Sequence, residues 1–150
     1  MSIILKDSQT KEIASKGIVL AGGCFDLIHP GHLEFLKRSK QLGKTFVLLL
    51  ESDENIKRKK GEDRPLNNQI VRAKNISKLG IVDYIILLKN PDSSQYYYNL
   101  VKSIQPDIIA VTTPDPLIEA KKEQAEMVGG KVVEVMKRDE NYSTSKLVDL

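Results

Sequence analysis

Cysteine, histidine and long apolar runs are all scarce in this sequence. The one cysteine excludes an intrachain disulfide framework and a metal site built from cysteines. Because disulfides are rare in the reducing cytoplasm, this composition is compatible with the cytoplasmic location that we expect. No apolar run approaches about 18 residues, so we expect no transmembrane helix and no membrane partner. The apolar patch at residues 3–5 gives way to charged residues, which is not the pattern of a secretory signal.

A strong charge of either sign is also lacking. The 23 lysines and arginines against 20 aspartates and glutamates give a net charge of +3. So mild a charge suits small anionic ligands and does not require nucleic acid. The basic run at residues 57–60 leaves a nucleic-acid-binding domain as a third possibility, but one short basic run gives it thin support, and such runs are ordinarily solvated surface. We therefore expect no nucleic-acid partner.

What the sequence does contain is a regular alternation of strand and helix patterns. It predicts strands at residues 17–22, 45–50, 82–88, 106–111 and 131–136. It predicts helices at residues 31–42, 67–79, 91–104 and 117–128, and a closing helix that begins at Ser143 or Thr144. Parallel strands joined by helical crossovers make an α/β, doubly wound, five-stranded parallel sheet with helices on both faces. Residues 1–16 are expected to form an N-terminal arm or helix ahead of a single domain at residues 17–150.

Two of these segments allow more detail. In the helix at residues 67–79, the helical period places Ile70, Ala73, Ile76 and Leu79 on the buried side. The polar segment at residues 51–65 is either a solvated loop or a mobile basic arm that closes over a triphosphate. Its place directly after a strand favours the arm, because ligands of open α/β sheets bind at that end of the strands.

The chain is organised around residues 22–32, between the first predicted strand and the first predicted helix. This stretch holds two adjacent glycines, Asp26 and both histidines of the chain, His29 and His32. Glycine allows close approach of the backbone to a ligand, and a helix N-terminus favours bound phosphate. Histidines three residues apart at a helix start can face one small volume, where they would stabilise charge during phosphoryl or nucleotidyl transfer. The plainer alternative is a tight turn with incidental histidines.

Other polar segments are expected to meet this stretch. The segments at 51–65, 112–116 and 143–145 each follow a predicted strand and can converge on one crevice of a doubly wound sheet. No motif pairs a serine, threonine or cysteine nucleophile with a base, and Cys24 is expected to pack rather than react. The predicted chemistry is therefore direct transfer to an acceptor that is already ionised. Catalysis would then rest on positioning and on neutralising charge at the α-phosphate.

The central stretch also carries a family resemblance. Gly23-Cys24-Phe25-Asp26 followed by His29-Pro30-Gly31-His32 resembles the paired motif of the cytidylyltransferase-like nucleotidyltransferases. This family includes glycerol-3-phosphate cytidylyltransferase, the adenylyltransferase domain of ADP-heptose synthase, archaeal FAD synthetase and phosphopantetheine adenylyltransferase. The resemblance covers nearly the whole chain beyond residue 16 and implies a Rossmann-like sheet.

The resemblance implies roles for individual residues. His29 and His32 would stabilise the transition state, and Lys60 and Arg72 would contact the nucleotide phosphates, which makes these four the catalytic residues. The implied nucleotide-binding residues are Gly22, Gly23, Cys24, Phe25, Asp26, Gly31, Asp115, Tyr142, Ser143, Thr144 and Ser145. Asp26 is sometimes placed near the metal or the acceptor, and no side chain is assigned as a direct metal ligand. Mg²⁺ is expected as the cofactor, carried by the triphosphate with few protein ligands.

These features predict a nucleotidyltransferase that transfers a nucleoside monophosphate from an NTP, with ATP favoured, and releases pyrophosphate. Its acceptor would be a phosphorylated small molecule of the sugar-phosphate type, such as heptose 1-phosphate. The chain has Gly22 where relatives often have asparagine, and Thr113-Pro114-Asp115 where they carry Gly-Asp, so the choice of ATP or CTP stays open. The alternatives are glycerol-3-phosphate cytidylyltransferase, FAD synthetase and a catalytically silent nucleotide-binding module. The resemblance is also compatible with a homodimer.

Overall fold

A parallel sheet forms the centre of the computed structural model, which describes residues 1–13, 15–89 and 93–138. Six strands pair in the order β1-β4-β3-β2-β5-β6. In chain order they are β1 (Ile3–Lys6), β2 (Ile18–Gly23), β3 (Thr45–Leu50), β4 (Tyr84–Leu87), β5 (Ile108–Thr113) and β6 (Lys131–Lys137). The helices are the short 3-10 helix η1 (Asp7–Glu12) and the α-helices α1 (Pro30–Lys40), α2 (Asp53–Lys60), α3 (Gln69–Ser77), α4 (Ser94–Ile104) and α5 (Ile118–Met127).

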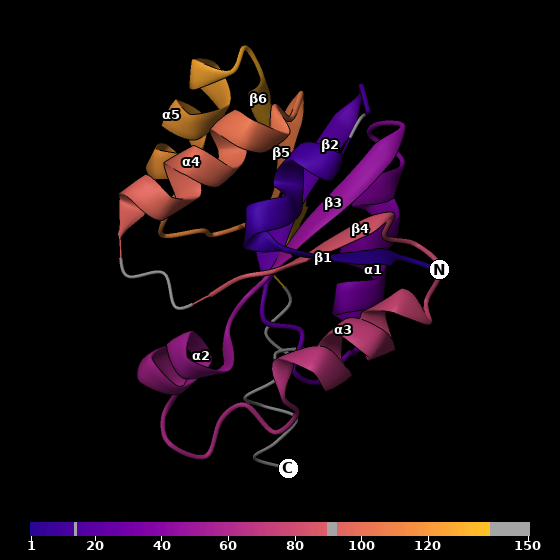
Figure 1. Ribbon diagram of the computed structural model, residues 1–150, viewed down its shortest axis with the longest axis vertical. Helices are drawn as coiled ribbons and strands as arrows, with labels where there is room; N and C mark the ends of the chain where they lie inside the picture. The colour runs from indigo at the N-terminus through magenta and orange to yellow at the C-terminus, as the bar shows by residue number, and fades with distance from the viewer. Residues whose placement is uncertain (14, 90–92, 139–150) are drawn as a thin grey trace.

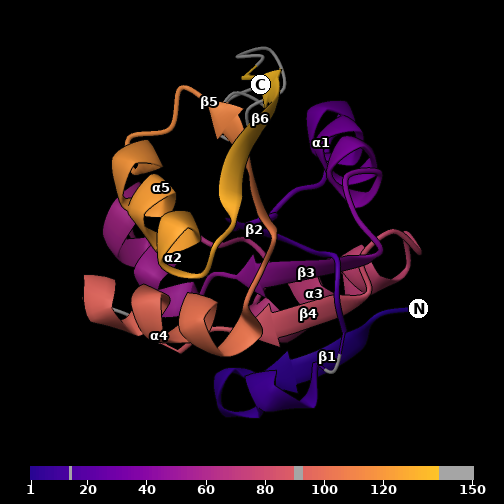
Figure 2. The ribbon, with the colours of Figure 1, turned by 90° about the horizontal axis from the view of Figure 1, so that it is seen from above.

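Helices cover both faces of this sheet (Figures 1 and 2). The side chains of β2 explain this arrangement, because those on both faces of the strand are apolar and need to be covered. Ile18 and Leu20 join a core cluster that includes residues of α4 and α5, whereas Val19 and Ala21 join a second cluster with residues of α1 and α3. A strand buried on both faces is typical of a covered parallel sheet. The predicted doubly wound α/β fold is therefore confirmed.

The sheet has one strand more than we expected. Residues 3–6 were expected to belong to an arm or helix, but they form β1, which pairs with β4 at the edge of the sheet. Only Leu5 of this strand is buried. The Ser2 hydroxyl donates to the carbonyl of Val82 at 2.6 Å and holds the start of β1 against the sheet. A four-residue edge strand with one buried side chain has too little apolar alternation to be distinguished in the sequence.

The polar segment after β3 is also more ordered than a loop. Residues 53–60 form α2, whose N-cap Ser52 accepts a hydrogen bond from the backbone N–H of Asn55 at 3.1 Å. Acidic residues occupy its first turn and basic residues its last turn, which suits the helix dipole. Figure 1 shows α2 beyond the ends of the strands, apart from α4 and α5.

Within the described residues, no helix is both long and apolar enough to cross a bilayer.

The strand order reverses between β2 and β5. From β2 the chain adds β3 and then β4 on one side, whereas β5 and β6 lie on the other side. The register between β2 and β5 comprises Val19 with Ile108 and Leu20 with Ile109, so the two strands pair only near their beginnings. Beyond these pairs the carboxyl ends of β2 and β5 diverge. Such a reversal point is where ligands bind in open α/β sheets.

Candidate active site

A cavity of about 510 Å³ lies at this reversal point. The structure brings together around it many of the residues that the sequence singled out. These are Gly22, Gly23, Cys24, Phe25, His29, Gly31, His32, Lys60 and Asp115. They come from the end of β2 and the loop after it, the start of α1, the last turn of α2 and the loop after β5. The expected convergence of segments at the carboxyl ends of the strands therefore holds for the described residues.

The loop after β2 depends on a glycine. Phe25 has a positive φ of 50°, and its ring lies against the backbone of Gly23. A Cβ on Gly23 would lie 2.5 Å from Cε2 of Phe25, a distance at which one of the two residues must move. Gly22 is different, because the nearest heavy atom to a Cβ there would be 3.6 Å away. Glycine at position 23 thus lets the Phe25 ring fold under the loop, with its centroid 4.9 Å from that of His32.

His29 and His32 form a reciprocal cap at the start of α1. The backbone N–H of His32 donates to Nδ1 of His29 at 3.3 Å, and the backbone N–H of His29 donates to Nδ1 of His32 at 3.4 Å. The two rings stack with centroids 3.6 Å apart and planes inclined by 19°. Because each Nδ1 accepts a hydrogen bond, each neutral ring carries its proton on Nε2. The same two side chains therefore cap the start of α1 and place both imidazoles there.

This arrangement favours the uncharged form of both rings. Burial lowers the pKa of His29 below its ordinary value. Burial, followed by the charges of His29 and Lys60, lowers the pKa of His32 to about 4, although a hydrogen bond with the Leu27 backbone acts in the opposite direction. Both imidazoles are therefore neutral hydrogen-bonding groups at pH 7. An anionic ligand in the cavity would oppose this shift, because a nearby negative charge favours the imidazolium form.

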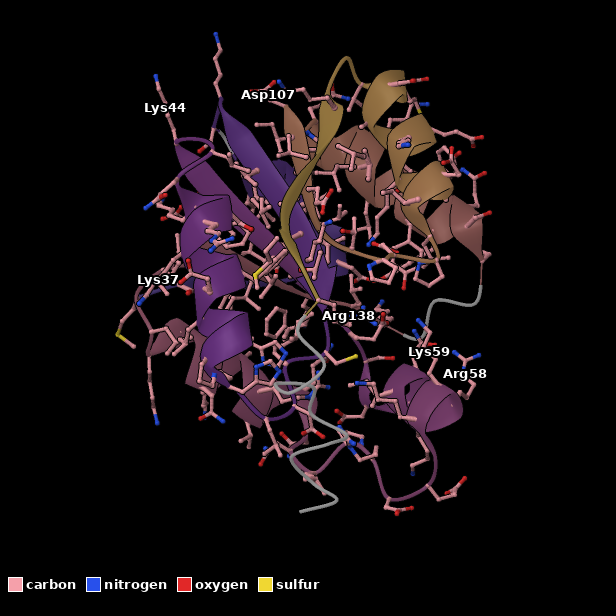
Figure 3. All side chains as sticks on the ribbon, turned by 180° about the vertical axis from the view of Figure 1, so that it is seen from behind. Lys37, Lys44, Arg58, Lys59, Asp107 and Arg138 are labelled. Carbon is pink, nitrogen blue, oxygen red and sulfur yellow. The ribbon has the colours of Figure 1, made fainter. Side chains whose placement is uncertain are left out.

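Cationic side chains surround the histidines. Lys60 reaches the cavity from the last turn of α2. Sequence reasoning missed two further cations, Lys121 of α5 and Arg138 just after β6. Figure 3 shows Arg138 where β6 ends, with Arg58 and Lys59 on α2 at the same end of the molecule. Arg138 follows the last predicted strand directly, so the rule that ligands bind at strand carboxyl ends could have identified it.

Lys121 is positioned through Asp115. Its Nζ lies 2.6 Å from Oδ2 of Asp115, while Oδ1 of Asp115 accepts a hydrogen bond from the backbone N–H of Leu117 at 2.8 Å. Asp115 was expected to bind nucleotide, and the structure places it at the cavity wall in a pair with a lysine. Thr112, from the predicted segment 112–116, also lines the cavity. The cavity is completed by residues that the sequence did not single out as a site, which are Phe35, Ala110, Val111 and Met136.

Arg72 does not reach the cavity. Its side chain is fully buried, with an exposed fraction of 0%. The guanidinium donates to the backbone carbonyls of Cys24 at 2.8 Å, Glu51 at 2.9 Å and Asn67 at 3.0 Å, and to the Asp53 carboxylate at 2.6 Å. A contact between Arg72 and nucleotide phosphates, as the resemblance implies, is therefore not available in this arrangement. Arg72 instead joins the loop after β2 to the end of β3 and the start of α2.

Asp26 is likewise buried under the loops. Its Oδ1 accepts from the backbone N–H of Asn67 at 2.8 Å, and its Oδ2 accepts from the backbone N–H of Leu66 at 2.7 Å and from Nε of Arg64 at 3.2 Å. With hydrogen bonds on both oxygens, this carboxylate holds the segment between α2 and α3. Among the described residues, no three histidine, cysteine, aspartate or glutamate side chains form a metal-binding group.

Cys24 lines the cavity as a partly buried thiol. Burial raises its pKa, and the positive charges of Lys60 and Arg72 only partly oppose the effect. Because the thiolate is the nucleophilic form, this environment agrees with a cysteine that packs. The remaining predicted nucleotide-binding residues, Tyr142, Ser143, Thr144 and Ser145, lie outside the described residues, as does the predicted closing helix.

Comparison with known proteins shows which family this chain resembles. Residues 20–149 match the family model described as cytidylyltransferase-like. Curated relatives called "Bifunctional protein HldE" include one from Campylobacter curvus, 34% identical over 147 residues, or 93% of this chain. Another, from Helicobacter pylori (strain G27), is 34% identical over 141 residues, or 94% of this chain. The chain covers only 29% of the length of each of these relatives.

Solved structures agree with the sequence relatives. A lipopolysaccharide core biosynthesis protein from Thermoplasma volcanium is 30% identical, with a TM-score of 0.67, and the match covers 81% of this chain and 98% of that one. Pantothenate synthetase from Thermus thermophilus has a TM-score of 0.73 over 100% of this chain and 68% of its own, but at 13% identity it shows the fold alone. The predicted resemblance is therefore confirmed, and the chain belongs to the cytidylyltransferase-like family of nucleotidyltransferases.

Proposed function

We propose that the chain transfers a nucleoside monophosphate from an NTP, with ATP favoured, to a phosphorylated small molecule. The observation that carries the proposal is the stacked pair of His29 and His32, which caps α1 and faces a cavity lined by Lys60, Lys121 and Arg138. Hydrogen-bond donors and cations fixed at a helix N-terminus stabilise charge that develops on a phosphoryl group. The volume of about 510 Å³ lies within the range typical of small-molecule sites.

The proposed reaction needs no enzyme nucleophile. An oxygen of the acceptor phosphate forms a bond to the α-phosphorus of the NTP. The bond from this phosphorus to the bridging oxygen of the β-phosphate breaks, and pyrophosphate leaves with the bonding electrons. In the proposed step, the histidine pair and the N-terminus of α1 stabilise the negative charge at the α-phosphate, and the cations lower the repulsion between two anionic reactants. The acceptor phosphate is ionised at neutral pH, so no general base is required.

The side chains around the cavity fit a metal ion that is carried into the site by the nucleotide. The described residues offer no group of three metal-binding side chains, and both oxygens of Asp26 already accept hydrogen bonds from the segment before α3. Mg²⁺ in phosphoryl-transfer sites is commonly held by substrate phosphates with few protein ligands. When bound, it would supply charge neutralisation at the triphosphate. Lys60, Lys121 and Arg138 would bind the phosphate oxygens that the ion leaves free.

A heptose-type acceptor is the preferred form of the proposal. The HldE relatives and the lipopolysaccharide core biosynthesis protein support a sugar phosphate such as heptose 1-phosphate, and with it ATP as the donor. Glycerol-3-phosphate cytidylyltransferase and FAD synthetase are the alternatives within the family. The cytoplasmic location, the homodimer and the absence of a nucleic-acid partner remain predictions.

The test is pyrophosphate release with Mg²⁺ and each of ATP, CTP, GTP and UTP. The acceptor panel holds heptose 1-phosphate, glycerol 3-phosphate, FMN and phosphopantetheine. Release with ATP and heptose 1-phosphate is the expected result. Release with CTP and glycerol 3-phosphate would move the chain to another branch of the family. If no pair of nucleotide and acceptor gives pyrophosphate release, while ATP or CTP still raises the melting temperature of the protein, the result would favour the catalytically silent module.

A further inference from the structure

Strand β6 has one residue more than its pairing with β5 accommodates. Glu134 pairs with Val111. The next pair is Met136 with Thr112, which leaves Val135 as an extra residue in a β-bulge. β6 is at the edge of the sheet, and it borders the cavity through Met136. Bulges are frequent at sheet edges and beside active sites, where they change the direction of a side chain.

The bulge interrupts the alternation of side chains along β6. In a regular strand, successive side chains point to opposite faces of the sheet. Val135 and Met136 are consecutive, yet both pack against the core cluster that contains residues of α1 and α3. After Met136 the alternation resumes, which directs Arg138 to this face and Lys137 to the opposite one. Accordingly, Met136 and Arg138 line the cavity, whereas the described residue between them, Lys137, does not.

A regular strand of the same sequence would present a different cation to the cavity. Unbroken alternation after Val135 would place Lys137 on the face of α1 and Arg138 on the opposite face, because a shift of one residue exchanges the two faces of a strand. These two cations differ in chemistry. The guanidinium of arginine holds two phosphate oxygens in a planar fork, whereas the ammonium of lysine is a point charge. The bulge therefore determines which kind of phosphate contact this wall of the cavity offers.

A side chain of α1 holds the bulge. Nη1 of Arg38 donates to the carbonyl of Val135 at 3.2 Å. Nε of Arg38 donates to Oε1 of Glu34, one turn earlier on the helix, at 2.7 Å, and this ion pair orients the guanidinium. Beyond the bulge, the backbone N–H of Arg138 donates to the carbonyl of Thr113 at 2.7 Å. Together these hydrogen bonds stabilise β6 in its bulged register.

We infer that Arg38 is a positioning residue for nucleotide binding, because it holds the β6 bulge in the register that directs Arg138 into the cavity. The inference rests on the proposed function, in which Arg138 binds phosphate oxygens of the nucleotide. Arg38 is not among the described residues that line the cavity, so it acts through Arg138. Without Arg38 the carbonyl of Val135 loses its donor, and the regular register, with Lys137 in place of Arg138, becomes more favourable. The helix that carries the histidine pair thereby also sets the direction of a phosphate-binding cation.

The first comparison establishes which cation faces the nucleotide. Binding of ATP with Mg²⁺ is measured by isothermal titration calorimetry without an acceptor, so that binding is separated from turnover. Arg138→Ala and Lys137→Ala remove the same charge from adjacent positions. We expect Kd for ATP to rise about tenfold or more in Arg138→Ala, as for the loss of a charged hydrogen bond, and to change by less than about twofold in Lys137→Ala. Equal weakening in the two variants would overturn the inference.

The second comparison tests Arg38 itself. We expect Arg38→Ala to raise Kd for ATP by about threefold to tenfold, the range that corresponds to one hydrogen bond. Lys37→Ala removes the neighbouring exposed charge of the same helix, on the side away from Arg138 (Figure 3), and should leave Kd unchanged. Arg38→Lys keeps the charge but cannot serve two acceptors at once, so it should also raise Kd. It carries the comparison if Arg38→Ala fails to fold.

A double-mutant cycle gives a readout that a merely structural role would not move. In the Arg138→Ala background, Arg38→Ala should have no further effect on Kd, because the side chain that it positions is gone. A general loss of structure would instead weaken binding by the same factor in both backgrounds. The same cycle is run with CTP if pyrophosphate release identifies CTP as the donor.

The outcomes separate this inference from the proposed function. Nucleotide binding by the wild type, with an unchanged Kd in Arg38→Ala or with the same factor in both backgrounds, would overturn the inference and leave the nucleotidyltransferase intact. If the wild type bound neither ATP nor CTP and released no pyrophosphate with any acceptor, the proposed function would be wrong, and the assignment of Arg38 with it.

Discussion

The guanidinium of Arg72 donates a hydrogen bond to the backbone carbonyl of Cys24 at 2.8 Å, across 48 positions of the sequence. The same buried group also holds the Glu51 carbonyl and the Asp53 carboxylate. The loop that carries the histidines and the helix that carries Lys60 are therefore fixed to one side chain. Arg72 stabilises the site from beneath and does not enter it.

Arg72→Lys should consequently lower the stability of the free protein. An ammonium group cannot reproduce the planar fork, so several buried acceptors lose their donor at once. We expect a loss of about 3–5 kcal/mol in the free energy of unfolding, as for other disrupted buried pairs. Urea unfolding measures it, with Arg58→Lys on the exposed side of α2 as the control. Unchanged stability in Arg72→Lys would contradict the assigned role.

His32→Asn separates catalysis from capping. An asparagine side chain can still accept the hydrogen bond from the backbone N–H of His29 while it removes the rest of the imidazole. We expect turnover to fall by about 10²-fold or more, as for other groups that stabilise developing charge. The melting temperature should stay close to that of the wild type. Near-normal turnover would exclude His32 from the transfer step.

The low pKa of His32 predicts a pH-dependent stability. Between its ordinary pKa of 6.5 and the folded-state value of about 4, the unfolded chain binds a proton that the folded chain does not. Stability must therefore fall as the pH is lowered through this window. From pH 7 to pH 5 we expect a loss of about 1–2 kcal/mol from this group. Urea unfolding of the wild type and His32→Asn at both pH values measures it. An identical pH dependence in the two proteins would contradict the prediction.

Lys60→Ala tests the cation at the end of α2. Lys60 is exposed in the free protein, so the melting temperature should hardly change. KM for the nucleotide should rise by about tenfold or more, as expected for the loss of a charged hydrogen bond to phosphate. Lys57→Ala, an exposed lysine of the same helix outside the cavity, is the matched control. A large drop in melting temperature would instead mean that Lys60 is structural.

Gly23→Ala and Gly22→Ala form a pair that differs by one position. At Gly23 the added methyl group would lie 2.5 Å from the Phe25 ring, whereas at Gly22 it meets nothing closer than 3.6 Å. We expect Gly23→Ala to cost about 1–3 kcal/mol in stability, as for other overpacked sites, and to lower turnover by displacing the loop. Gly22→Ala should be nearly neutral in melting temperature and in pyrophosphate release. Equal effects of the two substitutions would show that the Phe25 contact does not constrain the loop.

The sequence predicted the layers of the fold better than the direction of individual side chains. Apolar runs such as residues 45–50 are buried on both faces, so their pattern identifies a covered parallel sheet. The helical period placed Ile70 on the buried side of α3, but Ile70 is 48% exposed. Arg72 is fully buried instead. Periodicity ranks residues by hydropathy, and it cannot find an arginine whose donors are all satisfied by backbone carbonyls from other segments.

Sequence reasoning could identify cavity residues when a side chain suited to phosphate chemistry also lay in a segment that follows a predicted strand. His29, His32 and Lys60 have side chains suited to phosphate chemistry and lie in segments that follow predicted strands, and they line the cavity. Lys121 lies within a helix, so nothing local distinguished it from solvated surface. Its place depends on the tertiary contact with Asp115, which no sequence period encodes.

The short pairing between β2 and β5 determines where this cavity opens. The two strands share a register only at Val19 with Ile108 and Leu20 with Ile109, while Gly22, Gly23, Ala110 and Val111 further along both strands line the cavity. The cavity is therefore a split between two neighbouring strands, held open by the divergence of their backbones. The width of the cavity is set by the position at which the pairing of β2 with β5 ends. A change that lengthened this ladder by even one pair would narrow the space for substrate without altering any residue that touches it.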